Sequence, residues 1–337
     1  MSEGKVLIIG GAGMVGRKLA ERLAADGELG GRALASLHLS DVVEPTLPSG
    51  LGDGVGRASV VDLSEPGTAA RLIADRPDTV FHLAAIVSGE AERDFDKGYR
   101  INLDGTRMLL DAIHAAHRED GYTPRVVFTS SIATFGVPFP DTIPDDYHLT
   151  PLTSYGAQKA IGELLVADHS RKGHLDGISI RLPTICIRPG KPNAAASSFF
   201  SGILREPING QEAILPVGDD VRHWFASPRS AVGFLVHAAT VPMERFREVC
   251  GAHASLDMPG LSATVAEQID ALERVVGSEA AARIRRERDP EIEAIVSTWP
   301  KGFEAHRARQ LGFTAETSFD EIIRIYLEDE MDGATAN

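Results

Sequence analysis

The sequence predicts an α/β protein with a doubly wound parallel sheet, followed by a smaller C-terminal domain. Short apolar runs alternate with helical patterns from the N-terminus to about Arg181, and such strands are typical of a parallel sheet covered by helices on both faces. A glycine-rich loop, Gly10 to Gly16, directly follows the first apolar run. After Leu182 the chain becomes rich in proline, glycine and small polar residues. These features indicate a Rossmann-type first half and a differently built second half.

The first half of the chain alternates between strand and helix patterns. We place strands on the apolar, β-rich runs, at Lys5–Ile9, Ser36–Ser40, Ala58–Val61, Thr79–Leu83, Arg125–Thr129 and Gly177–Leu182. We place helices between them, at Val15–Ala25, Gly67–Asp75, Lys97–Arg118 and Ser154–Arg171.

The second half carries fewer regular patterns. Leu182 to Gly233 is rich in proline, glycine and small polar residues, and we expect this half to consist of long loops and a few helices, at Pro228–Thr240 and Ala263–Val276. Ser262 is the expected N-cap of the last helix. We expect residues 1–182 to form the first domain and residues 183–330 mainly the second, with some segments returning to the first.

Composition narrows the possible partners and compartments. The chain has 337 residues and a formal net charge of −14, which argues against nucleic acid or an anionic membrane as the main partner. Cys186 and Cys250 are the only cysteines, too few for a disulfide framework or a thiolate metal site. We therefore expect no metal site and a cytoplasmic location. The first apolar run, Val6 to Ile9, is too short for a signal peptide or membrane span.

The glycine loop predicts a dinucleotide site. Gly10 allows a tight turn, Gly13 lets the backbone approach a pyrophosphate, and Gly16 permits close packing of helix on strand. Met14 and Val15 open the helix, whose N-terminal N–H groups favour an anion. A glycine-rich turn without a ligand is the alternative. It is disfavoured because strand, loop and helix occur in the required order.

Asp41 and Asp62 indicate which dinucleotide binds. Asp41 ends the second predicted strand, 25 residues after Gly16; an acidic residue about 20 residues on hydrogen-bonds the adenosine ribose in NAD-binding folds. The insert around Gly27–Arg32 explains the longer spacing. A carboxylate here repels a 2′-phosphate, so NAD is favoured over NADP, although Asp41 could instead cap the strand end. Asp62 and Leu63, after the third strand, are the candidates to contact adenine.

Tyr155 and Lys159 form a candidate acid/base pair. Four residues apart on a predicted helix, their side chains lie on one face. A tyrosine hydroxyl titrates near about 10, and a neighbouring ammonium lowers that pKa. The alternative is a packed tyrosine beside a solvated lysine, a spacing that occurs by chance in many helices.

Several motifs occur together in one order along the first half of the chain. They are the glycine loop, Asp41, Asp62, the run His82 to Ala85, Asn102, the run Thr129 to Ser131, Tyr155 and Lys159. This set resembles the extended short-chain dehydrogenase/reductase family, also described as the NAD-dependent epimerase/dehydratase family. Ile9 departs from it, because that family usually has threonine before the glycine loop.

The resemblance implies a role for each of these residues. Tyr155 acts as general base toward a substrate hydroxyl, and Lys159 lowers its pKa and binds the nicotinamide ribose. Ser131, five residues before Gly136, holds the reacting oxygen rather than Ser130. Asn102 helps to position the lysine. The residues Leu83, Ala84 and Ala85 contact the cofactor, and His82 packs below it.

Three further segments carry a more specific resemblance. The segments Ile86 to Glu90, Arg181 to Ser197 and His223 to Arg229 resemble those of bacterial D-erythronate dehydrogenases, which oxidise the C2 hydroxyl of a four-carbon sugar acid with NAD. The implied partner is a small anionic sugar acid. Because arginine binds carboxylates through a planar fork, the candidates for the carboxylate are Arg188 and Arg222, and those for the hydroxyls are Ser88, Thr184 and Asn193.

Two other functions stay open at this stage. A nucleoside-diphosphate-sugar epimerase or dehydratase with tightly bound NAD would also use Arg222, but the following residues, His223 to Ala226, differ from the usual segment of such enzymes. A non-catalytic NAD-binding module is disfavoured because Tyr155 and Lys159 are both present. The family resemblance also implies a homodimer formed through the helices that contain residues 102–118 and 160–167.

Overall fold

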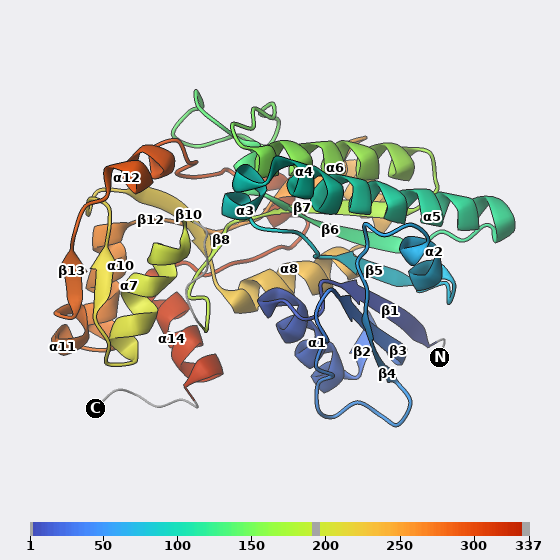
Figure 1. Cartoon of the computed structure of the whole chain (residues 1–337), viewed down its shortest axis with the longest axis horizontal. Coiled ribbons are helices and arrows are strands. Elements are labelled where there is room, and N and C mark those ends of the chain that lie inside the picture. Colours follow the sequence, from blue (N-terminus) through green and yellow to red (C-terminus); the bar gives the residue numbers. More distant parts are fainter. Residues whose placement is uncertain (1–2, 191–195, 332–337) are drawn as a thin grey trace.

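A computed structural model, described here for residues 3–190 and 196–331, shows a large sheet with helices on both faces and a second group of elements at one end (Figure 1). Within these residues the main sheet has eight strands in the order β11-β7-β6-β5-β1-β3-β2, with β4 paired to β3. The strands run Gly4–Ile9 (β1), Glu28–Leu29 (β2), Arg32–Asp41 (β3), Gly56–Val60 (β4), Thr79–His82 (β5), Arg125–Ser131 (β6), Asp176–Leu182 (β7) and Ser255–Asp257 (β11). All pairings are parallel except β2 with β3. The predicted Rossmann-type fold is confirmed.

The insert predicted around residues 27–32 is a hairpin. β2 pairs antiparallel with the start of β3, and Gly30 and Gly31 form its turn with φ of 62° and 76°. Such positive φ values favour glycine. β3 therefore begins at Arg32, four residues before the predicted start.

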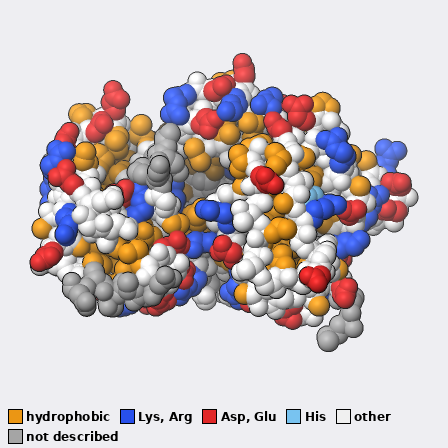
Figure 2. Space-filling view, turned by 60° about the horizontal axis from the view of Figure 1, so that its bottom comes forward, with side chains coloured by type: hydrophobic (Ala, Val, Ile, Leu, Met, Phe, Trp, Pro, Cys, Tyr) orange, Lys and Arg blue, Asp and Glu red, His pale blue; other side chains and the backbone are white. Residues whose placement is uncertain are grey.

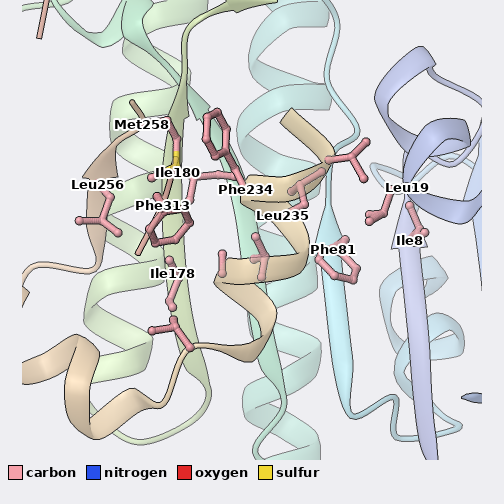
Figure 3. Packing of buried hydrophobic residues seen from close by; sticks show 14 of the residues in the cluster. Ile8, Leu19, Phe81, Ile178, Ile180, Phe234, Leu235, Leu256, Met258 and Phe313 are labelled. Atoms are coloured by element: carbon pink, nitrogen blue, oxygen red, sulfur yellow. The ribbon is translucent and has the colours of Figure 1, made fainter. Parts of the chain in front are cut away.

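Helices cover both faces of the sheet, as expected for a doubly wound fold. One face holds α1 (Met14–Asp26) and α8 (Pro228–Thr240), and the other holds α2 (Thr68–Ile73), α5 (Gly105–Asp120) and α6 (Ser154–Arg171). Alternation along β1 sends Val6 and Ile8 to the first face and Leu7 and Ile9 to the other; Figure 3 shows Ile8 in the core of the first face. Apolar burial on both faces explains why these strands read as continuous apolar runs.

A second apolar core lies at the other end of the molecule. A three-stranded sheet, β12-β10-β8, comprises Leu261–Thr264 (β12), Arg222–Ala226 (β10) and Thr184–Ile185 (β8). The core also includes residues of α7 (Ser198–Ile208), α10 (Val265–Val275) and α14 (Phe319–Glu330). The prediction of long loops and a few helices for this half omitted α7 and β10, which bury Phe200, Ile203, Leu204 and Phe225.

Two segments of the second half lie with the first domain. α8 packs on the main sheet through Phe234 and Leu235, and β11 extends that sheet beside β7. The remaining elements are Ser88–Arg93 (α3), Phe95–Gly98 (α4), Ile132–Thr134 (η2), Ala213–Leu215 (β9), Met243–Cys250 (α9), Ser278–Ala281 (α11), Ile284–Arg286 (β13), Pro290–Val296 (α12) and His306–Gln310 (α13).

Two predicted helix boundaries were wrong. The single helix expected at Lys97–Arg118 is divided into α4, a widened π-helical turn at Tyr99–Asp104 (η1) and α5. The helix expected from Ala263 starts instead at Val265, because Thr264 is its N-cap and forms a capping box with Glu267. Ser262 lies in β12, where its hydroxyl donates to the carbonyl of Lys301 at 2.6 Å.

The surface agrees with the ordinary charge content of the chain. Figure 2 shows acidic and basic side chains interspersed over one face of the molecule. Among the described residues, no helix has the length and apolarity needed to cross a membrane.

Candidate active site

A cavity of about 430 Å³ lies where the order of the parallel strands reverses, between β1 and β5. In open parallel sheets this edge, at the carboxyl ends of the strands, is the usual ligand site. Its walls come from both cores. The predicted site residues that line it are Gly10, Gly13, Met14, Val15, Gly16, Leu83, Ala85, Ser88, Ser131, Tyr155, Lys159, Thr184 and Arg188.

The glycine loop forms a cradle that requires glycine at positions 10 and 16. Gly10 has a φ of 96°, and a Cβ added there would lie 2.6 Å from the backbone nitrogen of Ala84. A Cβ on Gly16 would lie 2.2 Å from the carbonyl oxygen of Gly10. Gly13 is the N-cap of α1 and provides no side-chain cap, which leaves first-turn N–H groups for an anion. These residues fit the pyrophosphate of a dinucleotide.

Asp41 ties the end of β3 to the glycine loop. Its Oδ2 accepts from the N–H of Ala12 at 2.9 Å, and its Oδ1 accepts from the N–H of Val42 at 2.7 Å. The carboxylate thus makes the hydrogen bonds expected of a strand-end cap, which was the alternative interpretation, and it lies beside the glycine loop. It does not line the cavity itself.

Asp62, Leu63 and Ala84 also lie outside the cavity lining. Asp62 accepts from the N–H and hydroxyl of Ser64 at 2.8 and 2.6 Å and pairs with Arg100 at 3.1 Å. Burial raises the pKa of Asp62, but these hydrogen bonds and the arginine outweigh it and lower the pKa. Leu63 is buried in the core beneath α2 and α5.

Tyr155 and Lys159 lie one turn apart near the start of α6, as predicted. Thr153 caps this helix by accepting from the N–H of Gly156 at 3.1 Å. The Lys159 ammonium donates to the carbonyl of Thr129 at 2.8 Å. It also lies 4.8 Å from the ring centre of Phe128 and 5.7 Å from that of Tyr155. Lys159 is 2% exposed, so the alternative of a solvated lysine is wrong.

Burial has the largest influence on the pKa of both groups. It raises the pKa of Tyr155 to about 12, and a hydrogen bond with Ser131 opposes this rise. It lowers the pKa of Lys159 to about 8, and the negative charge of Glu163 opposes this fall. The spacing of the two residues indicates only the effect of the lysine on the tyrosine, whereas desolvation acts on both side chains.

Ser130 and Ser131 point in opposite directions from the end of β6. Ser131 lines the cavity, accepts from the N–H of Ala133 at 3.1 Å and hydrogen-bonds Tyr155. Ser130 is also among the lining residues, but it is 3% exposed and its hydroxyl donates to the Glu163 carboxylate. This arrangement supports the choice of Ser131 as the residue that meets substrate.

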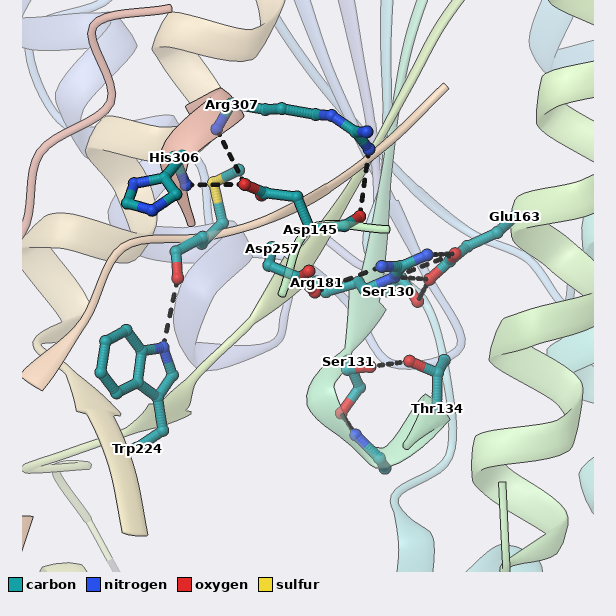
Figure 4. A network of polar contacts seen from close by, with 12 residues as sticks. Ser130, Ser131, Thr134, Asp145, Glu163, Arg181, Trp224, Asp257, His306 and Arg307 are labelled. Carbon is teal, nitrogen blue, oxygen red and sulfur yellow. Dashed lines mark hydrogen bonds and ion pairs between the residues drawn. The ribbon is translucent and has the colours of Figure 1, made fainter. Parts of the chain in front are cut away.

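A buried ionic network of Arg181, Glu163 and Asp257 adjoins Ser130 (Figure 4). Arg181 donates to Glu163 at 2.7 Å and to Asp257 at 3.2 Å. Its guanidinium also lies 5.0 Å from the ring centre of Phe135, a cavity residue. Because Glu163 is one turn after Lys159 on α6, the network joins α6 to β7 and β11.

Asn102 acts on the backbone of the cavity wall in this structure. Its side chain accepts from the N–H of Ile86 at 2.9 Å and donates to Gln158 at 2.8 Å. Asn102 does not line the cavity, whereas Ile86 does.

His82 is buried, contacts the Thr106 hydroxyl at 2.8 Å, and has its pKa lowered to about 3 by burial.

The candidate substrate residues are not all brought together. Ser88, Thr184 and Arg188 line the cavity. Arg222 does not line it; its side chain is 39% exposed and pairs with Glu267 at 3.3 Å. Asn193 lies outside the described residues.

Sequence reasoning missed His223 and the segment Thr298–Pro300, which line the same cavity. His223 is 2% exposed and contacts Thr184 and the carbonyl of Pro300. A histidine that alternates with Phe225 along a strand faces the same side as that core residue, and this was the available signal. Among the described residues, no group of three or more His, Cys, Asp or Glu side chains could hold a metal ion.

A glycine cradle at a strand-order reversal, facing a Tyr–Lys pair and a serine, defines an NAD-dependent enzyme of the extended short-chain dehydrogenase/reductase class. The chain belongs to the NAD dependent epimerase/dehydratase family, whose profile matches residues 6–233. The predicted family and the predicted cofactor, NAD, are confirmed.

Several proteins resemble the chain over nearly its whole length. D-erythronate dehydrogenase from Cupriavidus necator is 49% identical, over 96% of this chain and 98% of the relative. D-erythronate dehydrogenase from Haemophilus influenzae is 41% identical, over 97% of this chain and 100% of the relative. A crystal structure described as the nucleoside-diphosphate-sugar epimerase from Agrobacterium tumefaciens is 61% identical. It has a TM-score of 0.96 and covers 99% of this chain and 96% of that one.

Proposed function

We propose that this enzyme is an NAD-dependent dehydrogenase that oxidises the C2 hydroxyl of D-erythronate to 2-oxo-D-erythronate. The relatives from C. necator and H. influenzae support the substrate. In this proposal residues 1–182 hold NAD and the acid/base residues, and residues 183–330 mainly supply the substrate side. The observation that carries the proposal is Arg188, a cation in the same cavity as Tyr155 and Ser131.

Arg188 has the surroundings of a carboxylate anchor. Its guanidinium donates to the Ser197 hydroxyl at 3.2 Å, and no ion pair to it is found within the described residues. Burial lowers the pKa of Arg188, and neighbouring Arg205 adds to this effect. Arg188 is partly buried, and because a partly buried charge without an ion-pair partner is costly, an anionic ligand group would stabilise this arginine. A planar guanidinium can bind a carboxylate through two hydrogen bonds.

The remaining residues supply proton transfer. When bound against the glycine loop, NAD supplies the hydride acceptor. Tyr155 takes the proton from the C2 hydroxyl as the C2–H bond is lost and the carbonyl forms. The Ser131 hydroxyl donates to the reacting oxygen, and the Lys159 ammonium favours the phenolate of Tyr155. The products are a 2-oxo acid, NADH and a proton.

A second candidate is a nucleotide-sugar epimerase, favoured by the description of the A. tumefaciens structure. Such an enzyme would use the arginine of the C-terminal segment, Arg222, on the diphosphate. Here Arg222 is paired with Glu267 away from the cavity lining. The position of this arginine favours the sugar acid.

A spectrophotometric screen separates the two functions. The purified enzyme with NAD is offered C4 to C6 sugar acids and, in parallel, UDP- and GDP-sugars. We expect steady NADH absorbance with D-erythronate and none with nucleotide sugars. Turnover of a nucleotide sugar without added NAD, together with no NADH from any acid, would establish the epimerase instead.

Two matched arginine variants test the anchor. Arg188→Leu is expected to raise KM for D-erythronate roughly 100-fold, because a charge-assisted bidentate contact contributes about 1.5–3 kcal/mol. Arg222→Leu, at an exposed surface pair, should leave KM within about twofold. Equal effects of the two variants would contradict the assignment.

The homodimer and the cytoplasmic location expected from the sequence belong to this proposal as well. Leu164, whose exposed fraction is 66%, lies on α6, one of the two helices through which we propose that a second copy makes contact. Light scattering of the purified protein should give twice the chain mass of 36.1 kDa.

A further inference from the structure

His223 lines the substrate end of the cavity and contacts two other residues that line it. Its Nε2 lies 2.7 Å from the Thr184 hydroxyl, and its Nδ1 lies 2.9 Å from the carbonyl oxygen of Pro300. Phe200 stacks on the imidazole with ring centres 5.3 Å apart, and Phe225 meets it edge-on at 5.4 Å. The ring therefore has a fixed orientation in an apolar setting.

These two contacts determine which nitrogen carries the proton. A carbonyl oxygen can only accept, so Nδ1 must donate to Pro300. In neutral imidazole the other nitrogen is then an acceptor, and the Thr184 hydroxyl must donate its only proton to Nε2. Burial lowers the pKa of His223 to about 4, which keeps the ring neutral near pH 7.

From this chain of hydrogen bonds we infer that His223 is a positioning residue that makes the Thr184 hydroxyl an acceptor toward the cavity. Thr184 then binds a ligand donor, such as a substrate hydroxyl, and disfavours a carboxylate oxygen, which has no proton to give. Arg188, in contrast, can only donate. The two residues therefore determine the orientation of a bound hydroxy acid. Its carboxylate binds Arg188, and a hydroxyl other than the reacting one binds Thr184.

His223 also fixes the opposite wall. Trp299 and Pro300 line the cavity, and the bond from Nδ1 to the Pro300 carbonyl ties this segment to β10, while the Trp299 and His223 ring centres are 5.2 Å apart. One side chain thus joins β8 and the Thr298–Pro300 segment across the substrate end of the cavity.

The tautomer can be measured without any substrate. Long-range ¹H–¹⁵N NMR of protein labelled with ¹⁵N-histidine distinguishes protonated from unprotonated ring nitrogens, and His223→Asn identifies the signal by its loss. We expect a neutral ring with the proton on Nδ1 at pH 6 to 9. A proton on Nε2, or a ring that titrates near pH 6.5, would overturn the inference even if the enzyme is active.

The predicted contact between Thr184 and a substrate hydroxyl rests on the proposed function. It is tested by comparing Thr184 variants with D-erythronate and with its deoxy analogues. Thr184→Val should raise KM for D-erythronate about tenfold at nearly unchanged kcat, because one buried hydrogen bond is lost. Thr184→Ser, which keeps the hydroxyl, should remain near wild type. The penalty should vanish for one of the two analogues, 3-deoxy or 4-deoxy, that lacks the partner hydroxyl.

His223→Asn tests the histidine itself. The asparagine amide can still donate to Pro300, but it offers no acceptor at the Nε2 position. We expect a KM increase approaching that of Thr184→Val with kcat close to wild type, whereas thermal stability should fall because the packing of the ring on Phe200 and Phe225 is lost. A Thr184→Val penalty that is equal for all three substrates would refute the acceptor role. If wild-type enzyme reduces no NAD with D-erythronate, the proposed function fails, and the NMR result alone decides the tautomer.

Discussion

At the scale of single residues, the chemistry of this site depends on surroundings that a motif does not reveal. The spacing of Tyr155 and Lys159 predicts that they share a helix face, and the structure places both at one cavity. Their pKa values are governed mainly by burial. Burial depends on residues distant in sequence, such as Phe128 beneath the lysine, and sequence spacing cannot supply it.

Removal of the tyrosine hydroxyl tests its role directly. Tyr155→Phe is expected to lower kcat by roughly 10³-fold or more, since it removes general base catalysis, while NAD affinity by calorimetry stays near wild type. Tyr122→Phe, whose hydroxyl bonds the carbonyl of Pro77 away from the cavity, is the matched control. Full activity of Tyr155→Phe would contradict the mechanism.

Asp41 tests the choice of cofactor. Asp41→Ala should reduce the preference for NAD over NADP by about tenfold, because a charge-assisted hydrogen bond to the ribose is lost along with repulsion of the 2′-phosphate. Steady-state rates with both dinucleotides measure the ratio. Asp53→Ala, in an exposed loop, should not alter it. An unchanged ratio in Asp41→Ala would leave Asp41 as a strand-end cap only.

At the scale of elements, long periodic patterns could be predicted and short or interrupted ones could not. Ser154–Arg171 and Pro228–Thr240 match the observed α6 and α8 at both ends. The widened turn at Tyr99–Asp104 was missed because its residues are compatible with an ordinary helix. It is instead associated with tertiary bonds from Asn102 to Ile86 and Gln158. β8 has two residues, too few for any period to appear.

Contact between α6 and the turn after β6 sets the position of Tyr155. A Cβ added to Gly156 would lie 2.1 Å from the carbonyl oxygen of Ala133. Gly156→Ala should therefore displace the start of α6 and lower kcat roughly 100-fold, as expected for a misplacement of about 1 Å. Kinetics and chemical denaturation would both be measured.

Gly233→Ala provides the matched control for that change. Gly233 lies in α8, and an added Cβ would have no heavy atom within 4 Å. This variant should leave kcat unchanged and stabilise the protein by about 0.5–1 kcal/mol. Equal kcat in both variants would contradict the claim that α6 placement limits catalysis.

At the scale of the whole molecule, the site exists because two cores meet. Sequence periodicity predicts the parallel sheet and its covering helices. It therefore also predicts the edge of the sheet, at the carboxyl ends of the strands, where the cofactor binds. The substrate end is built from β8, β10 and the Thr298–Pro300 segment. β8 and the Thr298–Pro300 segment are more than 100 residues apart in the sequence, and His223 joins them. Local pattern carries no information on that convergence, which is why Arg222 was proposed and His223 was overlooked.

Buried histidines make the stability of the molecule depend on pH. Burial lowers the pKa of His38 to about 4, of His82 to about 3 and of His223 to about 4. Below pH 6.5 the unfolded chain binds protons that the folded chain does not, so stability falls as the pH falls. Each histidine should cost roughly 2 kcal/mol between pH 6.5 and 5.

Thermal unfolding between pH 7.5 and 5 measures this dependence. The melting temperature should fall steadily with pH, and His38→Gln should reduce the slope. His306→Gln should not, since the His306 side chain is 75% exposed. A melting temperature that is constant across this range would contradict the neutral, buried state of these rings.

The central claim, oxidation at C2 of D-erythronate by NAD, is tested most directly with substrate deuterated at C2. The enzyme is incubated with this acid and NAD, and the reduced cofactor is examined by mass spectrometry. We predict one deuterium in every NADH formed and its accumulation in step with the 2-oxo acid. NADH without deuterium would place the oxidation at another carbon, and deuterium retained in a sugar product with no NADH released would contradict the claim.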